Sequence, residues 1–273
     1  QVIIDECHHI SAFSFERVIK KAKARFVLGL TATPTRKDGH HPIIMMQCGP
    51  IRFRTSTRAQ ALERPFEHVV IPRFTDFSLP VELQVTATTS TTAIQDIYAA
   101  LVLNGQRNMM IFNDLMMVLE QGRSPLLITE RTEHLEYFAG MLKGFAKNII
   151  TLKGGMGVKK RREVAERIAS IPDSEERLLL GTGRYIGEGF DDARLDTLLL
   201  ALPISWRGTL KQYTGRLHRL HESKKVVRIY DYVDADVPVL MKMYARRLKG
   251  YRAIGYTLSG DEEFALNKER KNP

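Results

Sequence analysis

Two adjacent carboxylates, Asp5 and Glu6, follow a short apolar segment near the start of the sequence. Residues 2–5 favour a buried strand, and an open α/β sheet keeps its functional groups at the carboxyl ends of its strands. Adjacent carboxylates there suit a magnesium–triphosphate reaction, in which one holds Mg²⁺ and the next orients or deprotonates a water. The sequence therefore predicts Asp5 as the metal ligand and Glu6 as the catalytic base. An acidic strand end that turns into solvent is the alternative.

A zinc site is a second alternative for the same region. Zinc ligands normally come as spaced pairs such as Cys-x₂-Cys or His-x₃-His, whereas the candidates here are adjacent or isolated, which disfavours zinc. With 2 cysteines far apart, the chain has no disulfide framework, and we expect an intracellular, cytoplasmic setting. The candidate zinc ligands are Cys7, His8, His9, His40, His41 and Cys48.

A second polar set lies far along the chain. Gln212, Arg216 and Arg219 recur at i, i+4 and i+7, so they share one face of a helix. Gly215 leaves room for close approach on that helix. An arginine presented across a cleft can neutralise charge on a γ-phosphate, which is worth roughly 10³–10⁵ in rate. A basic amphipathic helix with a solvated face is the alternative.

The elements that position these residues form a regular pattern after residue 122. Apolar strands alternate with helices, which implies parallel βαβ units and a five-stranded sheet with its functional loops at the strand carboxyl ends. We expect strands over 125–129, 148–154, 177–183, 196–203 and 225–234, and helices over 131–145, 158–171, 208–221 and 237–252.

The earlier part of the chain is less regular. A strand is expected over 2–5, a helix over 14–24, and an apolar run over 25–34 that Pro34 stops. The expected domains are an incomplete α/β domain over 1–80, a linker with a helical lead-in over 81–121, and a second α/β domain with a C-terminal helix over 122–273. The remaining expectations are β-like pieces at 51–54 and 69–74 and helices over 93–103 and 107–121.

Four segments together resemble the motifs of superfamily 2 helicases of the DEAD/DEAH type. "VIIDECHH" resembles motif II, the Walker B segment, and "LTATP" (30–34) resembles motif III. "GEGFDDARLDTLLLALP" (187–203) resembles motif V, and "QYTGRLHR" (212–219) fits the Gln-x-x-Gly-Arg-x-x-Arg of motif VI. The four occur in the family order, and the pattern is most similar to the group of XPB-like repair helicases and restriction-enzyme translocases.

The resemblance implies RecA-like parallel sheets, the P-loop NTPase helicase fold, with ATP and Mg²⁺ as cofactors. It implies that Arg219 is an arginine finger and that Arg216 is its neighbour at the triphosphate. The glycines near 181–187 also mimic a dinucleotide fingerprint, but no amphipathic helix follows them, which excludes an oxidoreductase. The remaining implied residues are Gly189, Asp191 and Gln212 at the nucleotide, and His8, Thr31 and Thr33 for coupling to nucleic acid.

An excess of basic residues indicates an anionic partner. Lys and Arg number 41 against 31 Asp and Glu, a net charge of +10, which suggests nucleic acid first and a merely basic soluble protein otherwise. We expect DNA or RNA, DNA favoured, with restriction, repair or defence proteins as further partners, and no membrane. The candidate phosphate contacts are Thr129, Arg131, Thr182, Lys159, Lys160 and Arg161.

Each of those contacts has a structural alternative. Thr132 capping a helix would explain the polar turn at 129–132, and a solvated face would explain the basic run 159–162. Trp206 could stack on a base, although core packing is the alternative for a lone tryptophan.

The sequence contains no Gly-x-x-x-x-Gly-Lys-Ser/Thr loop. Superfamily 2 helicases need that loop for the β- and γ-phosphates and Mg²⁺. We therefore expect this chain to be a fragment of a longer ATP-dependent helicase or translocase, and to be inactive alone. A non-catalytic nucleic-acid-binding module and a motor subunit of a restriction or defence complex are the alternatives.

Overall fold

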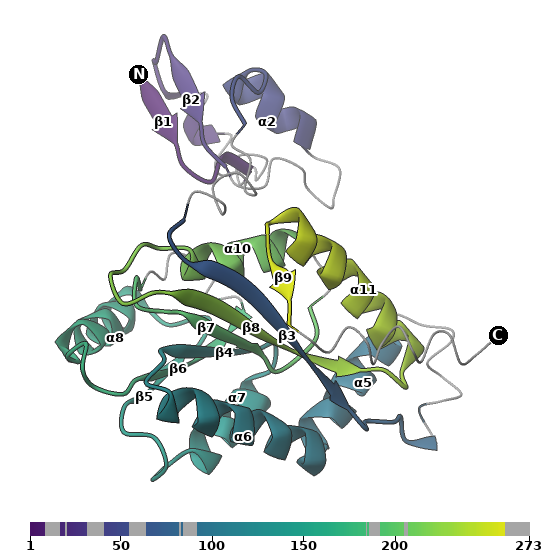
Figure 1. Cartoon of the computed structure of the whole chain (residues 1–273). Coiled ribbons are helices and arrows are strands. Elements are labelled where there is room, and N and C mark those ends of the chain that lie inside the picture. The colour runs from purple at the N-terminus through teal and green to yellow at the C-terminus, as the bar shows by residue number, and fades with distance from the viewer. Residues whose placement is uncertain are drawn as a thin grey trace. The chain divides into compact units, whose positions relative to one another are not determined.

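The computed structural model divides into two compact units, Gln1–Ser56 and Thr57–Pro273. Figure 1 shows the elements of both. The structure describes residues 1–8, 17–19, 21–31, 41–54, 64–81, 83, 92–183, 185, 192–204 and 207–259.

The larger unit is built on a parallel sheet of seven strands in the order β5-β6-β4-β7-β8-β3-β9. The five strands predicted after residue 122 form one continuous block, β5-β6-β4-β7-β8, and the α/β fold class is confirmed. The middle strand of this block, β4, is buried along its whole length, as expected for a parallel strand covered on both faces. The bounds are β3 Glu67–Thr75, β4 Pro125–Thr129, β5 Ile149–Leu152, β6 Leu178–Thr182, β7 Thr197–Leu200, β8 Val226–Asp234 and β9 Thr257–Leu258.

Helices cover both faces of this sheet (Figure 1). Because side chains alternate along a strand, Leu126 and Ile128 point to one face and Leu127 to the other. The first face packs against α8, α10 and α11, and the second against α6 and α7. The helix bounds are α5 Thr92–Leu103, α6 Gly105–Glu120, α7 Thr132–Met141, α8 Val158–Ser170, α10 Arg207–Leu217 and α11 Pro238–Ala253.

The domain boundary differs from the predicted one. Residues 1–80 were predicted to form one domain, whereas β3 pairs with β8 along its full length in the larger sheet. Two side-chain contacts fix it there: the buried Thr75 hydroxyl donates to Asp234 Oδ1 at 2.5 Å, and the partly buried Arg73 Nε donates to Asp114 Oδ2 at 2.9 Å. Pairing across such sequence distances leaves no local signal.

The segment predicted as a linker, 81–121, also contributes to the larger unit. From α6, Ile111 and Leu115 enter the core completely buried. Arg107, on the same helix, is buried and donates from Nε to Asp234 Oδ1 at 2.9 Å. The two helices were predicted correctly, but they are part of the packed structure.

The smaller unit contains two short parallel strands, β1 (Val2–Ile4) and β2 (Val27–Gly29). The helix α2 (His41–Cys48), which was not predicted, adds Ile44 to a small cluster around Cys7. Of the helix predicted over 14–24, residues 17–19 are helical, and part of the rest lies outside the described residues. Residues 51–54, predicted as β-like, form no regular element. In the described segments, no helix has the length and apolar character needed to cross a bilayer.

Candidate active site

The two carboxylates predicted to be catalytic lie in a tight turn after β1. Both Asp5 and Glu6 are exposed, and Asp5 Oδ1 accepts a hydrogen bond from the Glu6 amide at 2.9 Å. Among the described residues, Glu6 is the one non-glycine residue with a positive φ, 48°. A left-handed φ is uncommon for a residue with a side chain and often accompanies functional sites. The turn therefore holds two carboxylates side by side at the carboxyl end of a parallel strand.

His8 connects this turn to the segment that follows β2. Its Nδ1 lies 3.1 Å from Glu6 Oε2 and 3.0 Å from Thr31 Oγ1. The Cys7 amide also donates to the Leu30 carbonyl at 2.9 Å. The structure thus brings together Asp5, Glu6, His8 and Thr31, which sequence analysis had placed in two separate motifs. Thr33, the remaining predicted coupling residue, lies outside the described residues.

The two cysteines pack beneath the acidic turn. Both thiols are free, and burial raises the pKa of Cys7 to about 11, so its thiol is neutral at ordinary pH. A Cβ at Gly29 would lie 2.8 Å from Cys48 Sγ and 3.0 Å from Cys7 Sγ, so only glycine fits there without displacing them. Within the described segments, no group of three histidine, cysteine or acidic side chains is arranged to hold a metal. The side chains of His9, His40 and His41, from the zinc alternative, are outside that description.

The predicted arginine helix is α10, and it ends earlier than predicted. Gln212 and Arg216 lie on the helix, but the last helical residue is Leu217, so Arg219 lies beyond its end. Lys224, which is buried, donates from Nζ to Leu217 O at 2.9 Å and to Arg219 O at 2.8 Å. Because the lysine occupies these terminal carbonyls, the backbone leaves the helix there and holds Arg219 in a fixed turn.

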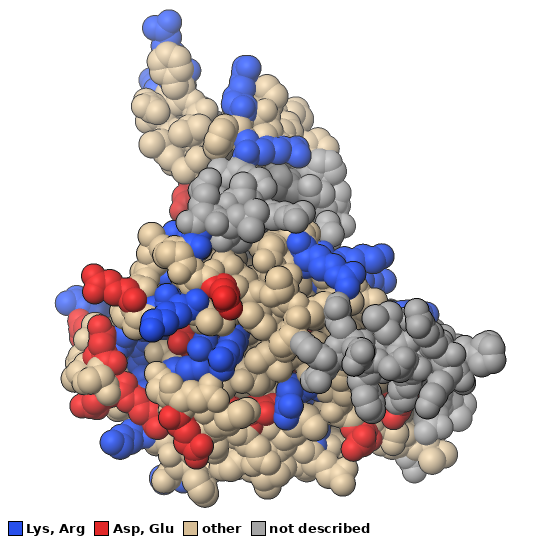
Figure 2. Space-filling model, in the orientation of Figure 1, with Lys and Arg blue, Asp and Glu red and all other residues tan. Residues whose placement is uncertain are grey.

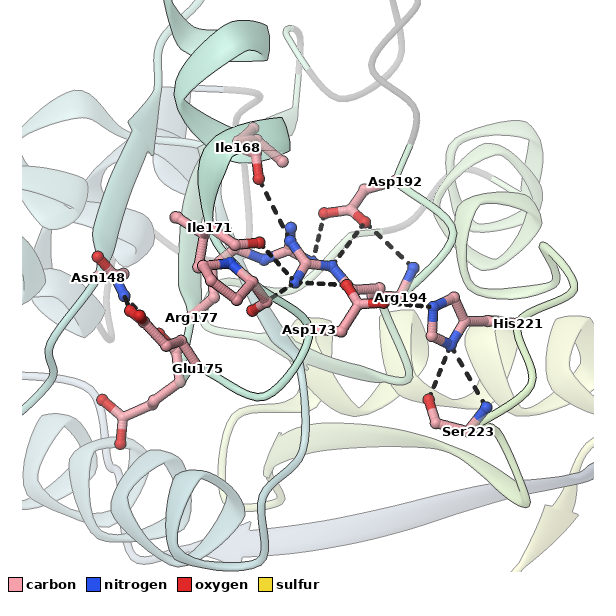
Figure 3. Close-up of polar contacts among 12 residues, drawn as sticks. Asn148, Ile168, Ile171, Asp173, Glu175, Arg177, Asp192, Arg194, His221 and Ser223 are labelled. Atoms are coloured by element: carbon pink, nitrogen blue, oxygen red, sulfur yellow. Dashed lines mark hydrogen bonds and ion pairs between the residues drawn. The ribbon is translucent and has the colours of Figure 1, made fainter.

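A charged network joins Asp192 and Arg194 of the motif V segment to the residues after α10 (Figure 3). Arg177 Nη2 lies 2.6 Å from Asp192 Oδ2, and Arg194 Nη1 lies 2.9 Å from Asp173 Oδ1. The other carboxylate oxygen of Asp173 is 3.7 Å from His221 Nε2. These contacts link the backbone around Asp192 with the backbone just past Arg219.

The same network caps α8 beside a cavity of about 730 Å³. Arg194 donates to the carbonyls of Ile168 and Ile171 at 3.2 and 3.1 Å, which satisfies the end of that helix. Both partners of the Arg177–Asp192 pair are buried, and the side-chain nitrogens of Arg177 are sealed from solvent. The pair is therefore structural, because a ligand in the cavity would not reach those nitrogens.

The predicted phosphate contacts fall into two groups. Thr129 and Thr182 are buried, and their hydroxyls make internal bonds: Thr129 Oγ1 lies 3.1 Å from His134 Nδ1, and Thr182 Oγ1 accepts from the Gly154 amide at 3.0 Å. By contrast, Lys159 and Lys160 are exposed at the start of α8. The exposed lysines are therefore free to meet a polymer, while the threonines shape the backbone.

Two arginines from that prediction are engaged within the larger unit. Arg131 donates to the Gln95 carbonyl at 2.6 Å and to Glu133 at 3.0 Å, and it occupies the N-cap position of α7 without a side-chain cap. The alternative that Thr132 caps this helix is therefore wrong. Arg161 donates to Met156 O at 3.0 Å, and its guanidinium lies 5.6 Å from the centre of the Tyr185 ring. Gly189, Asp191 and Trp206 lie outside the described residues.

A contact between Glu130 and Tyr213 was not predicted from the sequence. The Tyr213 hydroxyl, from α10, donates to Glu130 Oε1 at 3.2 Å just past the end of β4. Desolvation raises the pKa of Glu130, although the Tyr213 hydroxyl opposes the shift. A Cβ on Gly183, just after β6, would overlap both side chains, so the glycine admits this contact. Glu130 follows an apolar strand as Asp5 and Glu6 do, and that signal was available in the sequence.

Known proteins resemble this chain over nearly its whole length. "Putative ATP-dependent RNA helicase L396" of Acanthamoeba polyphaga mimivirus is 24% identical, covering 94% of this chain and 47% of the relative. "Putative helicase 161L" of Invertebrate iridescent virus 6 is 27% identical, covering 93% of this chain and 55% of the relative. The family model described as "Type III restriction enzyme, res subunit" matches residues 1–36, which include the acidic turn and its partner Thr31.

These matches support the assignment of the chain to the superfamily 2 helicases. The fold agrees: the solved structure of S. cerevisiae Dbp5, described as bound to RNA and ADP BeF3, matches with a TM-score of 0.59 and 11% identity. That match covers 99% of this chain and 63% of the Dbp5 chain and shows the RecA-like helicase fold. The predicted family and fold are confirmed, and the relatives support a helicase or translocase role. The chain spans about half the length of the curated relatives it matches.

Proposed function

We propose that this chain carries the ATP-hydrolysing residues and the nucleic-acid contacts of a superfamily 2 helicase or double-strand translocase. The observation that carries the proposal is the turn after β1, where Asp5 and Glu6 are adjacent and His8 joins Glu6 to Thr31. Acidic residues at a strand's carboxyl end suit triphosphate chemistry. A histidine shared between the acid and a hydroxyl of the next motif gives a short route from hydrolysis to nucleic-acid contacts.

The acidic turn fits Mg²⁺ by the chemistry of its donors. Asp5 and Glu6 are exposed carboxylates, and Mg²⁺ prefers oxygen ligands and keeps several of its waters. We assign Asp5 to the metal ion and Glu6 to the attacking water. When bound, Mg²⁺ would neutralise charge on the phosphates, while Glu6 accepts a proton from the water and His8 orients the Glu6 carboxylate.

The arginines of the larger unit are assigned to the same triphosphate. In this proposal Arg219 stabilises charge developing on the γ-phosphate, and Arg216 and Gln212 bind beside it. The anchoring of Arg219 O by Lys224 supports the assignment, because a fixed backbone limits the positions that the guanidinium samples. Gly189 and Asp191 remain assigned to the nucleotide through the motif V resemblance.

The nucleic-acid contacts are assigned to Lys159, Lys160, Arg131 and the backbone shaped by Thr129 and Thr182. Lys159 and Lys160 are the clearest of these, because both are exposed in the first turn of α8. We propose DNA or RNA as the polymer, with DNA first as the resemblance to repair helicases and restriction translocases implies. The chain carries no phosphate loop of the Gly-x-x-x-x-Gly-Lys-Ser/Thr type, so we propose that turnover needs a longer protein that contains it.

Arg219→Ala tests the assignment in that longer protein. Loss of an arginine finger is expected to slow nucleic-acid-stimulated ATP hydrolysis by at least about a hundredfold. Arg228→Ala is the matched control, because Arg228 lies near the start of β8, away from the strand carboxyl ends, and bonds to Gln121. A loss of less than about threefold for Arg219→Ala would remove it from the site.

A non-catalytic nucleic-acid-binding module is the alternative that the net charge of +10 favours. Such a module would bind nucleic acid without any stimulated ATP turnover in the longer protein. The match of residues 1–36 to a restriction-enzyme subunit favours a second alternative, a motor subunit in a restriction or defence complex. That alternative keeps the ATP chemistry and adds stable partner subunits, which co-purification would detect.

A further inference from the structure

The last long helix, α11, has an inner face whose charge is paired and an outer face whose charges are not. On the inner face, Arg247 is buried and donates to both oxygens of Asp231 at 2.8 and 2.9 Å and to Ile204 O at 3.1 Å. Tyr251 donates to the same carboxylate at 2.8 Å. Arg247 and Tyr251 thus hold the inner face of the helix against the sheet.

The outer face carries Lys242, Arg246 and Lys249, all exposed. Their spacing of four and three residues places them on one stripe of the helix, which we name the α11 basic face. Within the described part of the chain, none of these three side chains has a hydrogen-bond or ion-pair partner. Figure 2 shows Lys and Arg side chains gathered over α11.

The α11 basic face differs from other basic parts of the surface because no acidic residue is close to it in the sequence. No Asp or Glu occurs in the sequence between Asp236 and Asp261. Elsewhere an exposed cation is commonly paired: Arg162 contacts Glu166 at 2.8 Å, and Lys153 contacts Glu136 at 2.6 Å. An uncompensated row of charges attracts a polyanion more strongly than paired charges do.

The α11 basic face is rigidly joined to α10. A Cβ at Gly250 would lie 2.8 Å from Leu210 Cδ2, so the two helices approach closely at that point. Both helices also contribute side chains to one core cluster, including Leu210, Tyr213 and Tyr251. A polyanion bound to α11 would therefore be bound to the same rigid body that carries Arg216.

We infer that the α11 basic face binds the phosphate backbone of nucleic acid. The inference rests on the proposed function, since it adds a second contact surface to the polymer that Lys159 and Lys160 meet. Lys242 and Lys249 are seven residues apart, about 10.5 Å along the helix axis. That length matches about three nucleotide steps of one strand, at ~3.4 Å each along a duplex, so each cation can meet a different phosphate.

A lipid surface fits the same face poorly. Membrane-binding helices insert an apolar side, whereas the apolar side of α11, including Leu240 and Met243, is buried in the core. Besides its charged residues, the exposed side of α11 carries only Pro238, Ala245 and Ala253, which offer little apolar surface to insert. An acidic protein segment remains as a competing occupant, and the experiment below separates it from nucleic acid.

The test is a salt titration of nucleic-acid binding with charge-matched variants of this chain. Lys242→Gln, Arg246→Gln and Lys249→Gln are combined in one variant, since glutamine keeps the helix propensity. The control combines Lys143→Gln, Lys147→Gln and Lys225→Gln, three exposed lysines outside α11 and α8. Binding to a short labelled duplex and to the matching single strand is measured from about 50 to about 200 mM salt.

The inference predicts a specific loss. The slope of log K against log salt becomes shallower by about 2 to 3 for the α11 variant and is unchanged for the control, because each lost phosphate contact removes about 0.7–0.9. Equal changes in both variants would overturn the inference in favour of a net-charge effect. If the wild-type chain binds nucleic acid and the α11 variant binds it equally well, the inference is overturned, while the proposed function is left intact.

Two further outcomes separate the remaining cases. If the wild-type chain binds no nucleic acid, the nucleic-acid part of the proposed function fails together with the inference. If polyglutamate binds the wild-type chain as tightly as the duplex and loses affinity in the α11 variant, the occupant is an acidic protein and the inference is overturned.

Lysine acetylation of the wild-type chain gives the same answer without any variant. Bound duplex is expected to protect Lys242 and Lys249 from acetylation and to leave Lys143 and Lys147 reactive. Equal reactivity of Lys242 with and without bound duplex would contradict the inference even if the variants failed to fold.

Discussion

The two units bury their sheets to very different extents. In the larger unit, Leu126 and Leu127 lie on opposite faces of β4 and are both 0% exposed. In the smaller unit, Ile3 on β1 is 61% exposed and Leu28 on β2 is 46% exposed. The predicted catalytic acids thus belong to the unit with the smaller described core, where hydrogen bonds around one turn do most of the positioning. The free energy of folding must come mainly from the larger unit.

Truncating one leucine in each unit should give the largest contrast. Leu127→Ala is expected to lower the free energy of unfolding by about 2–5 kcal/mol, because it leaves a cavity in a fully packed core. Leu28→Ala is expected to cost less than about 1 kcal/mol, because nearly half of that side chain is already in water. Denaturant unfolding of the two variants measures both. Equal costs would show that the smaller unit is packed as tightly as the larger.

Hydrogen exchange sharpens the same contrast residue by residue. Amides of β1 and β2 are expected to exchange at least about thirtyfold faster than those of β4 and β6, a difference of ~2 kcal/mol in opening free energy. The cause is the shorter ladder and the small cluster around Cys7 and Ile44. Mass spectrometry of the exchanging chain measures the protection. Equal protection of both sheets would contradict the comparison.

A buried histidine should make the larger unit sensitive to mild acid. Burial, with Arg107 nearby, lowers the pKa of His134 to about 3, below its unfolded value of 6.5. Between those values the unfolded chain binds a proton that the folded chain does not, so stability falls as pH falls from about 6.5 towards 3. His134 alone contributes at most about 1.4 kcal/mol per pH unit to the slope.

His134→Gln is the control for this pH effect. Glutamine can keep one of the contacts to Asn108 and Thr129, which lie 2.9 and 3.1 Å from the two ring nitrogens, and it does not titrate. Thermal unfolding over the same pH range should then show a flatter dependence. An unchanged slope in the variant would assign the acid sensitivity to other groups.

Much of the larger unit follows from local sequence patterns. Strands such as "PLLIT" are apolar throughout, and their alternation with amphipathic helices was enough to predict the five-stranded block. The last two strands of the sheet order, β3 and β9, were not predicted as part of this sheet, because strand pairing between distant segments depends on contacts such as Thr75 with Asp234. Likewise α2 has no strong amphipathic pattern, so the local sequence does not predict this helix.

The candidate site was predicted only where its residues are close in the sequence or belong to a recognised motif. Asp5 and Glu6 are adjacent in the sequence, so their shared turn was predictable, and His8 and Thr31 come from recognised motifs. Glu130 and Tyr213 were missed because they meet through the fold, 83 residues apart, across a glycine that carries no side chain. The end of α10 was misplaced because Lys224, outside the helical pattern, terminates it.

Glu6→Gln, measured in the longer protein that contains this chain, tests the central claim most directly. Glutamine keeps the size of the side chain but cannot accept the proton, so nucleic-acid-stimulated ATP turnover should fall by about 10²–10⁴ while ATP binding persists. Glu67→Gln, an exposed acid at the start of β3, is the control and should leave turnover unchanged. Turnover retained by Glu6→Gln with normal ATP binding would contradict the assignment of this turn as the catalytic site.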